Sequence, residues 1–137
     1  MKVLEEIINV QRCAWEPTDT GLRAVALLAA RRDSSIYKGH FPGKPITPGV
    51  CMIGAVVELL SQATGKTLQL AKVNNIKYLS MMSPDDIDGA TLAATLTALP
   101  LDKGESPKGG KGYTATATFT KGDTIYAKMK LTLITKS

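Results

Sequence analysis

The sequence is poor in the residues that build metal sites, disulfide frameworks and aromatic binding platforms. Its 137 residues include one histidine and two cysteines, and aromatic residues make up 5%. Cys13 and Cys51 are too few for a disulfide framework, and no CxxC or cysteine/histidine spacing indicates zinc. No basic run interleaves with aromatics, which argues against stacking platforms for single-stranded nucleic acid. We therefore expect no metal site and no nucleic-acid partner.

Long apolar runs are also missing. The longest uncharged run that includes the main predicted helix extends from Pro45 to Val57 and stops at Glu58, which is too short to cross a bilayer. Glu5 and Glu6 fall where a signal peptide would need an unbroken apolar segment. These absences predict a cytoplasmic protein with no membrane partner.

The composition that remains is typical of a globular protein. Hydrophobic residues make up 44% and charged residues 21%, and the length predicts a single domain over residues 1–137. The formal net charge is +5. A weakly basic surface would steer an acidic protein or a phosphorylated carrier toward the site.

Period-two patterns predict strands on both sides of a central helix. Residues 8–15 and 21–30 favour extended backbone and are separated by Pro17 and a turn, which predicts a hairpin, with residues 31–38 continuing its second strand. Further strands are predicted for residues 68–82, 90–99, 113–120 and 124–135, and a loop for residues 103–112.

One helix is predicted from Val50 to Thr64, between Gly49 and Gly65. Its first part is apolar all round except for Glu58, so other structure must wrap it. One helix cannot cover both faces of a sheet, so the sheet must curl around it. This arrangement is an α+β hotdog fold, a curled antiparallel sheet wrapped around one central helix. Its open edge strand predicts pairing of two protomers.

The loop YKGHFPGKPITPGV, residues 37–50, holds the only histidine, His40. Its prolines and glycines restrict the backbone and would fix the position of the imidazole. Gly49 precedes the helix, so its N–H lies at the positive end of the helix dipole, where an oxyanion binds well. A base beside an oxyanion site suits proton abstraction next to a carbonyl. The alternative is that His40 only ties the loop down through a hydrogen bond.

Glu58 is the second candidate for chemistry. An ionised carboxylate in an apolar helix must find partners, raise its pKa or reach a wet cleft, and a raised pKa would make it a proton donor. The alternative is that the helix emerges into solvent at this turn, which Ser61 and Gln62 support.

Residues 40–46, HFPGKPI, and residues 48–50, PGV, followed by an apolar helix, resemble the signature of the hotdog 3-hydroxyacyl-(acyl carrier protein) dehydratases of bacterial fatty-acid synthesis. Residues 75–78 and 83–86 resemble that family more loosely. The resemblance implies removal of water from a 3-hydroxyacyl thioester to give the trans-2-enoyl thioester, with no cofactor. It implies that His40 takes the α-proton and that the Gly49 N–H holds the thioester carbonyl.

The resemblance also implies a helix carboxylate from the other subunit of a dimer. Counting forward from His40, the family position is Gly54; counting back from the helix end, the run from Glu58 to Gly65 resembles the family's EAMAQATG. The two counts differ by about one helical turn, and helical side chains lean toward the N-terminus, so Glu58 is predicted to be the acid.

The predicted partners are acyl carrier protein and a second copy of the chain, as a homodimer or a dimer-based higher oligomer. Two other functions stay open: a non-catalytic hotdog subunit that binds the carrier and works with an active partner, and a hotdog acyl thioesterase. Met52, Ile53 and Val57 could also be core residues. The residues predicted to bind substrate are Phe41, Pro48, Val50, Met52, Ile53, Gly54 and Val57.

Overall fold

A computed structural model describes residues 2–39, 41, 43–99 and 111–135. Its strands form one antiparallel sheet in the order β1-β2-β4-β5-β6-β3. The strands are β1 (Ile8–Thr18), β2 (Gly21–Ala30), β3 (Leu68–Tyr78), β4 (Thr91–Ala98), β5 (Gly112–Lys121) and β6 (Thr124–Thr135). The helices are α1 (Val3–Glu6), α2 (Ser35–Gly39), α3 (Gly49–Thr64) and α4 (Pro84–Ile87).

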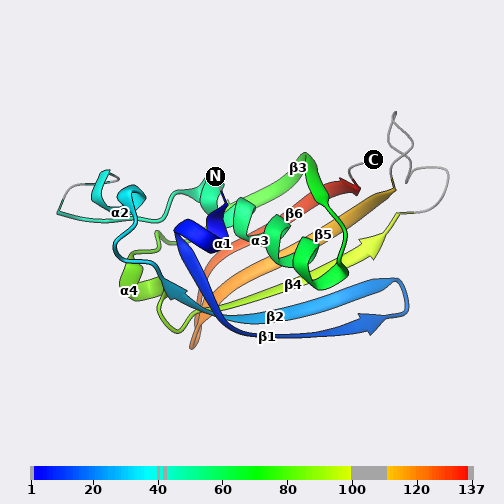
Figure 1. The fold of residues 1–137 in the computed structure, drawn as a ribbon, viewed down its shortest axis with the longest axis horizontal. Helices are drawn as coiled ribbons and strands as arrows, with labels where there is room; N and C mark the ends of the chain where they lie inside the picture. Colours follow the sequence, from blue (N-terminus) through cyan, green and yellow to red (C-terminus); the bar gives the residue numbers. More distant parts are fainter. Residues whose placement is uncertain (1, 40, 42, 100–110, 136–137) are drawn as a thin grey trace.

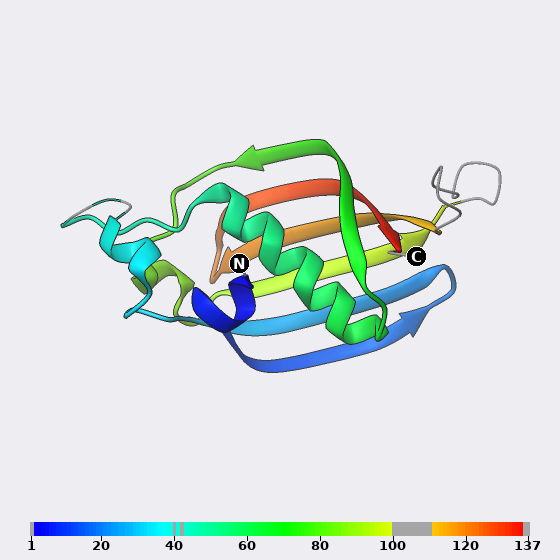
Figure 2. The ribbon, with the colours of Figure 1, turned by 45° about the horizontal axis from the view of Figure 1, so that its top comes forward.

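The core lies between α3 and the concave face of the sheet (Figures 1 and 2). Strands β2, β4, β5 and β6 bury every second side chain, as an antiparallel strand with one covered face should. The buried side chains of α3 are Cys51, Met52, Ala55, Val56, Leu59 and Leu60. The predicted hotdog arrangement is therefore confirmed.

Helix α3 matches its predicted bounds closely. Pro48 is the residue before its first turn, and Gly65 ends it with a φ of 70°, a left-handed conformation that favours glycine. The helix is less enclosed than predicted, because Val50 is 73% exposed. No helix within the described parts of the chain is both long and apolar enough to cross a membrane.

Two strand predictions extended too far. Residues 31–38 do not continue β2: the Arg31 N–H donates to the Ile7 carbonyl, and the following residues turn into α2. The strand predicted to reach residue 82 ends at Tyr78, because the N–H groups of Leu79 and Ser80 both donate to the Tyr126 carbonyl and the chain then leaves the sheet. Most of the loop predicted for residues 103–112 lies outside the described residues.

Helix α1, which sequence patterns did not predict, is anchored to the middle of α3. The two carboxylate oxygens of Glu58 accept hydrogen bonds from the backbone N–H groups of Val3 and Leu4, at 2.8 and 2.9 Å. A Cβ built on Gly54 would lie 2.7 Å from Cγ2 of Val3. The glycine therefore leaves the space that the Val3 side chain fills. The Nη2 group of Arg31 donates to the Leu4 carbonyl at 2.8 Å and so gives α1 a further hydrogen bond.

We expect Glu58→Ala to loosen this anchor. Two partly buried N–H groups would lose their acceptor, which lowers the free energy of unfolding by about 1–3 kcal/mol. Urea denaturation measures the loss, and hydrogen exchange at the Val3 and Leu4 amides should become faster. The matched control is Gln62→Ala, because Gln62 is an exposed residue of the same helix. Unchanged stability and unchanged amide protection would contradict the anchoring role.

Candidate functional site

The chain leading into α3 is held by hydrogen bonds as well as by prolines. Phe41 and Lys44 exchange backbone hydrogen bonds, and Gly43 between them has a φ of 78°. Thr47 is buried; its N–H donates to the Met82 carbonyl at 2.7 Å, and its hydroxyl lies 2.9 Å from the Tyr37 hydroxyl. These bonds fix the loop to α2 and to the segment after β3. His40, the predicted base, lies outside the described residues.

Gly49 is the first residue of α3 and lies next to the ring of Tyr78. Its N–H donates to no other described residue, so it is available to a ligand at the positive end of the helix. A Cβ built at Gly49 would lie 2.5 Å from the hydroxyl oxygen and from Cζ of Tyr78. Only glycine therefore lets Tyr78 lie this close to the start of the helix. The arrangement suits a carbonyl oxygen that gains negative charge.

A mostly apolar pocket of about 490 Å³ begins at this helix start. It brings together four of the predicted site residues, namely Phe41, Pro48, Gly49 and Met52. The rest of its lining is Ile46, Thr47, Tyr78, Leu79, Ser80, Met81 and Met82. An apolar pocket with a few polar groups at one end is the usual form of a small-molecule site.

The segment from Tyr78 to Met82 was not predicted as part of the site. The signal was present in the sequence, because the run YLSMM carries large apolar side chains directly after a strand. Met81 is 73% exposed and Leu79 is 54% exposed, so both face the opening rather than the core. Burial raises the pKa of Tyr78, so its hydroxyl remains protonated near neutral pH and can donate a hydrogen bond.

Helix α4 fixes the far end of that segment. Ser83 and Asp86 form a reciprocal capping box, and the Tyr126 hydroxyl donates to Asp86 at 3.0 Å. Partial burial pushes the pKa of Asp86 up, but the hydrogen bonds from Ser83 and Tyr126 outweigh it and hold the pKa below its ordinary value. The carboxylate is therefore ionised near neutral pH, and the wall of the pocket stays attached to the sheet.

The remaining predicted residues lie outside the pocket lining. Val50 is exposed, whereas Ile53, Gly54 and Val57 are half-buried along α3. Glu58 also does not line the pocket, and both of its oxygens are bound to α1. Its role as a proton donor stays a prediction. The described part of the chain has no cluster of histidine, cysteine and carboxylate side chains able to hold a metal.

Comparison with solved structures supports the fold. The dehydratase heterocomplex ApeI:P from Xenorhabdus doucetiae has a chain that superposes with a TM-score of 0.65, covering 91% of this chain and 96% of that one at 18% identity. A hypothetical thioesterase with coenzyme A from Streptococcus pneumoniae gives a TM-score of 0.52, with 93% and 88% coverage at 9% identity.

Sequence comparison points to dehydratases. The 3-hydroxyacyl-(acyl-carrier-protein) dehydratase FabZ of Clostridium acetobutylicum is 38% identical over 79 residues, which are 53% of this chain and 56% of that protein. The chain thus spans about half the length of this curated relative. The family model of the ApeI dehydratase matches residues 16–98, which is more than half of the chain. On that match, the chain belongs to the ApeI-like dehydratase family.

Proposed function

We propose that the chain dehydrates 3-hydroxyacyl thioesters carried on acyl carrier protein and releases trans-2-enoyl thioesters. The observation that carries this proposal is the apolar pocket that begins at the Gly49 N–H of α3, which donates to no other residue that the structure describes. An acyl chain would lie against Met52 and the methionines after β3. The thioester carbonyl would then accept a hydrogen bond from the Gly49 N–H. Membership of the ApeI-like dehydratase family supports the same reaction class.

The proposed steps use two side chains. His40 removes the α-proton, and the electron pair of that C–H bond forms the Cα–Cβ double bond as the hydroxyl leaves. Glu58 supplies the proton that turns the departing hydroxyl into water. Negative charge on the carbonyl oxygen is stabilised by the Gly49 N–H at the helix start. For Glu58 to act in this way, at least one of its two bonds to α1 must open.

Two observations favour a second candidate function. The Glu58 carboxylate is occupied by α1, and Val3 covers the family's carboxylate position at Gly54. Both features suit a subunit that binds the acyl carrier and works with a partner that supplies the carboxylate. The ApeI:P protein of Xenorhabdus doucetiae is described as a heterocomplex. A chain of this second kind would be inactive alone and active in a mixed assembly.

Purified protein incubated with 3-hydroxyacyl and 2-enoyl thioesters tests the reaction. We expect wild type to interconvert them, and His40→Ala to lose about 10²–10⁴-fold in rate because it removes the general base. Glu58→Gln should lose a comparable factor if Glu58 is the acid, with unfolding measured in parallel to separate loss of the anchor from loss of chemistry.

Each outcome has a distinct meaning. No turnover in wild type would overturn the proposed reaction for the chain alone, and turnover restored by a second hotdog chain would favour the two-subunit candidate. Release of free thiol would indicate a thioesterase. Full activity in Glu58→Gln would remove that residue as the acid while leaving the reaction in place.

We expect Gly49→Ala to damage the pocket without unfolding the protein. The added methyl would displace the Tyr78 ring, and a displacement of about 1 Å at a reacting centre can cost about 100-fold in rate. The measurement is kcat/KM with an enoyl thioester. The control is Gln62→Ala, because Gln62 is an exposed residue of the same helix and lies outside the pocket lining. Partial recovery in the Gly49→Ala/Tyr78→Ala double variant would identify the ring as the cause, and no recovery would refute it.

We also propose that two copies pair through β3. Among the described strands, this edge strand hydrogen-bonds only to β6, and most of its residues are exposed, including Leu70 and Val73 at 39% each. A second strand would satisfy its free N–H and carbonyl groups. We expect light scattering to give a dimer or a multiple of a dimer, and Val73→Pro to shift it to monomer. A monomeric wild type at working concentration would remove this part of the proposal.

A further inference from the structure

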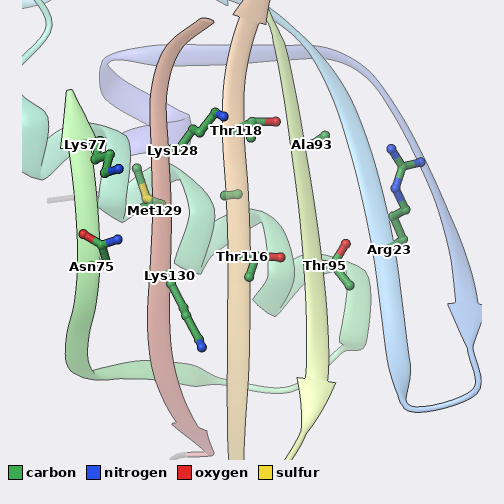
Figure 3. A pocket seen from close by; sticks show the side chains of 11 residues that line it. Arg23, Asn75, Lys77, Ala93, Thr95, Thr116, Thr118, Lys128, Met129 and Lys130 are labelled. Atoms are coloured by element: carbon green, nitrogen blue, oxygen red, sulfur yellow. The ribbon is translucent and has the colours of Figure 1, made fainter. Parts of the chain in front are cut away.

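The convex face of the sheet, on the side opposite α3, carries a basic groove (Figure 3). The groove has a volume of about 430 Å³ and extends over five strands. Its cationic lining residues are Arg23, Lys77, Lys128 and Lys130, and no carboxylate is among its lining residues. Figure 3 shows Lys128 and Lys130 leaning from β6 toward β5. The proposed reaction uses none of these side chains.

Strand registers align the lining in two neighbouring rows across the sheet. The pairings of the first row join Arg23, Thr95, Thr116, Lys130 and Asn75. Those of the second row join Ala93, Thr118, Lys128 and Lys77. Both rows have short side chains on β4 and β5 beside longer ones on β6 and β3, and the first row also has Arg23 on β2 at its other end. The groove is therefore a property of the strand register.

The cations of the groove form no ion pairs with the residues that the structure describes. Lys77 lies directly opposite Lys128 in the β3–β6 ladder, and like charges in directly opposed positions destabilise a sheet. Among the described residues, none of the four cations makes an ion pair or a side-chain hydrogen bond. Glu16 is the register partner of Arg23 on β1, but the two form no ion pair. An anion in the groove would relieve this repulsion.

The dimensions of the groove fit an α-helix. The backbones of β2 and β6, which carry Arg23 and the lysines, are separated by three strand spacings, about 14 Å. A helix with its side chains is about 10–12 Å across. Lys128 and Lys130 are about 6.6 Å apart along their strand, close to the roughly 5–6 Å between side chains three or four positions apart on a helix.

We propose that this groove binds an acidic α-helix of a partner protein, lying along β4 and β5 with carboxylates paired to Lys128 and Lys130 on one rim and Arg23 on the other. Threonine hydroxyls of the floor would meet the polar side of the helix. A second copy of the chain fits less well, since its net charge of +5 opposes contact with a basic face. The inference is independent of the proposed dehydratase chemistry.

The test is an NMR titration of the full chain with a synthetic helical peptide that carries glutamates three and four positions apart along one face. We expect shifts at the amides of Thr95, Thr116 and Thr118, weakened by added salt. The Lys128→Glu/Lys130→Glu variant should bind roughly tenfold or more weakly, because two ion pairs become repulsions. If that variant folds poorly, Lys128→Gln/Lys130→Gln takes its place.

Two matched controls make the test specific. The same peptide with glutamine for glutamate should not bind. Lys38→Glu/Lys111→Glu, which changes the net charge equally at exposed lysines outside the groove, should bind as wild type does. Equal affinity for the glutamine peptide, shifts centred elsewhere, equal loss in both variants, inorganic phosphate binding as tightly as the peptide, or self-association through this face would each overturn the proposal.

Discussion

The packing of α3 against the concave face of the sheet is the constraint on which the rest of the molecule depends. The strands can bury a helix because their inward positions are apolar and frequently alanine, as in β2 and β5. Burial of this apolar surface is the main favourable term in folding. It also fixes where α3 begins, and hence where the Gly49 N–H and the pocket beside it lie.

The start and the middle of α3 have different roles. Its first turn faces the pocket, where Gly49 accommodates the Tyr78 ring and Thr47 ties the incoming loop to Met82. Roughly one and a half to two and a half turns after Gly49, Gly54 leaves space for α1 and Glu58 binds it. A glycine and a carboxylate one turn apart therefore form a docking site for the chain's own N-terminal helix. This explains how an acidic side chain is accommodated on a largely apolar helix, because two backbone N–H groups satisfy it.

The residue types on the convex face are less constrained, since that face does not pack against the core and need not be apolar. Alternation in β5 places Thr114, Thr116 and Thr118 outward, and β6 adds lysines opposite the last two of them. Chain order alone would not bring Arg23, Lys77 and Lys128 together, because they come from three separate strands. The register of the sheet gathers them into one groove.

Local patterns were enough to predict the architecture and part of the site. Period two in the last two strands and the uninterrupted apolar segment after Gly49 predicted β5, β6 and α3 nearly residue by residue. Where the local pattern failed, hydrogen bonds to distant residues determined the structure. The N–H groups of α1 donate to Glu58, and β2 ends where the Arg31 N–H donates to the Ile7 carbonyl. Short segments have little intrinsic preference, so tertiary hydrogen bonds determine them.

The sequence by itself determined the curled sheet around one helix and the glycine at the helix start, because periodicity and glycine placement are local properties. The tertiary structure alone decided that Tyr78 to Met82 complete the pocket and that the Glu58 carboxylate meets α1. It also decided that cations from β2, β3 and β6 share one groove. Those outcomes depend on distances between residues far apart in the chain, and such distances are set only when the sheet closes around α3.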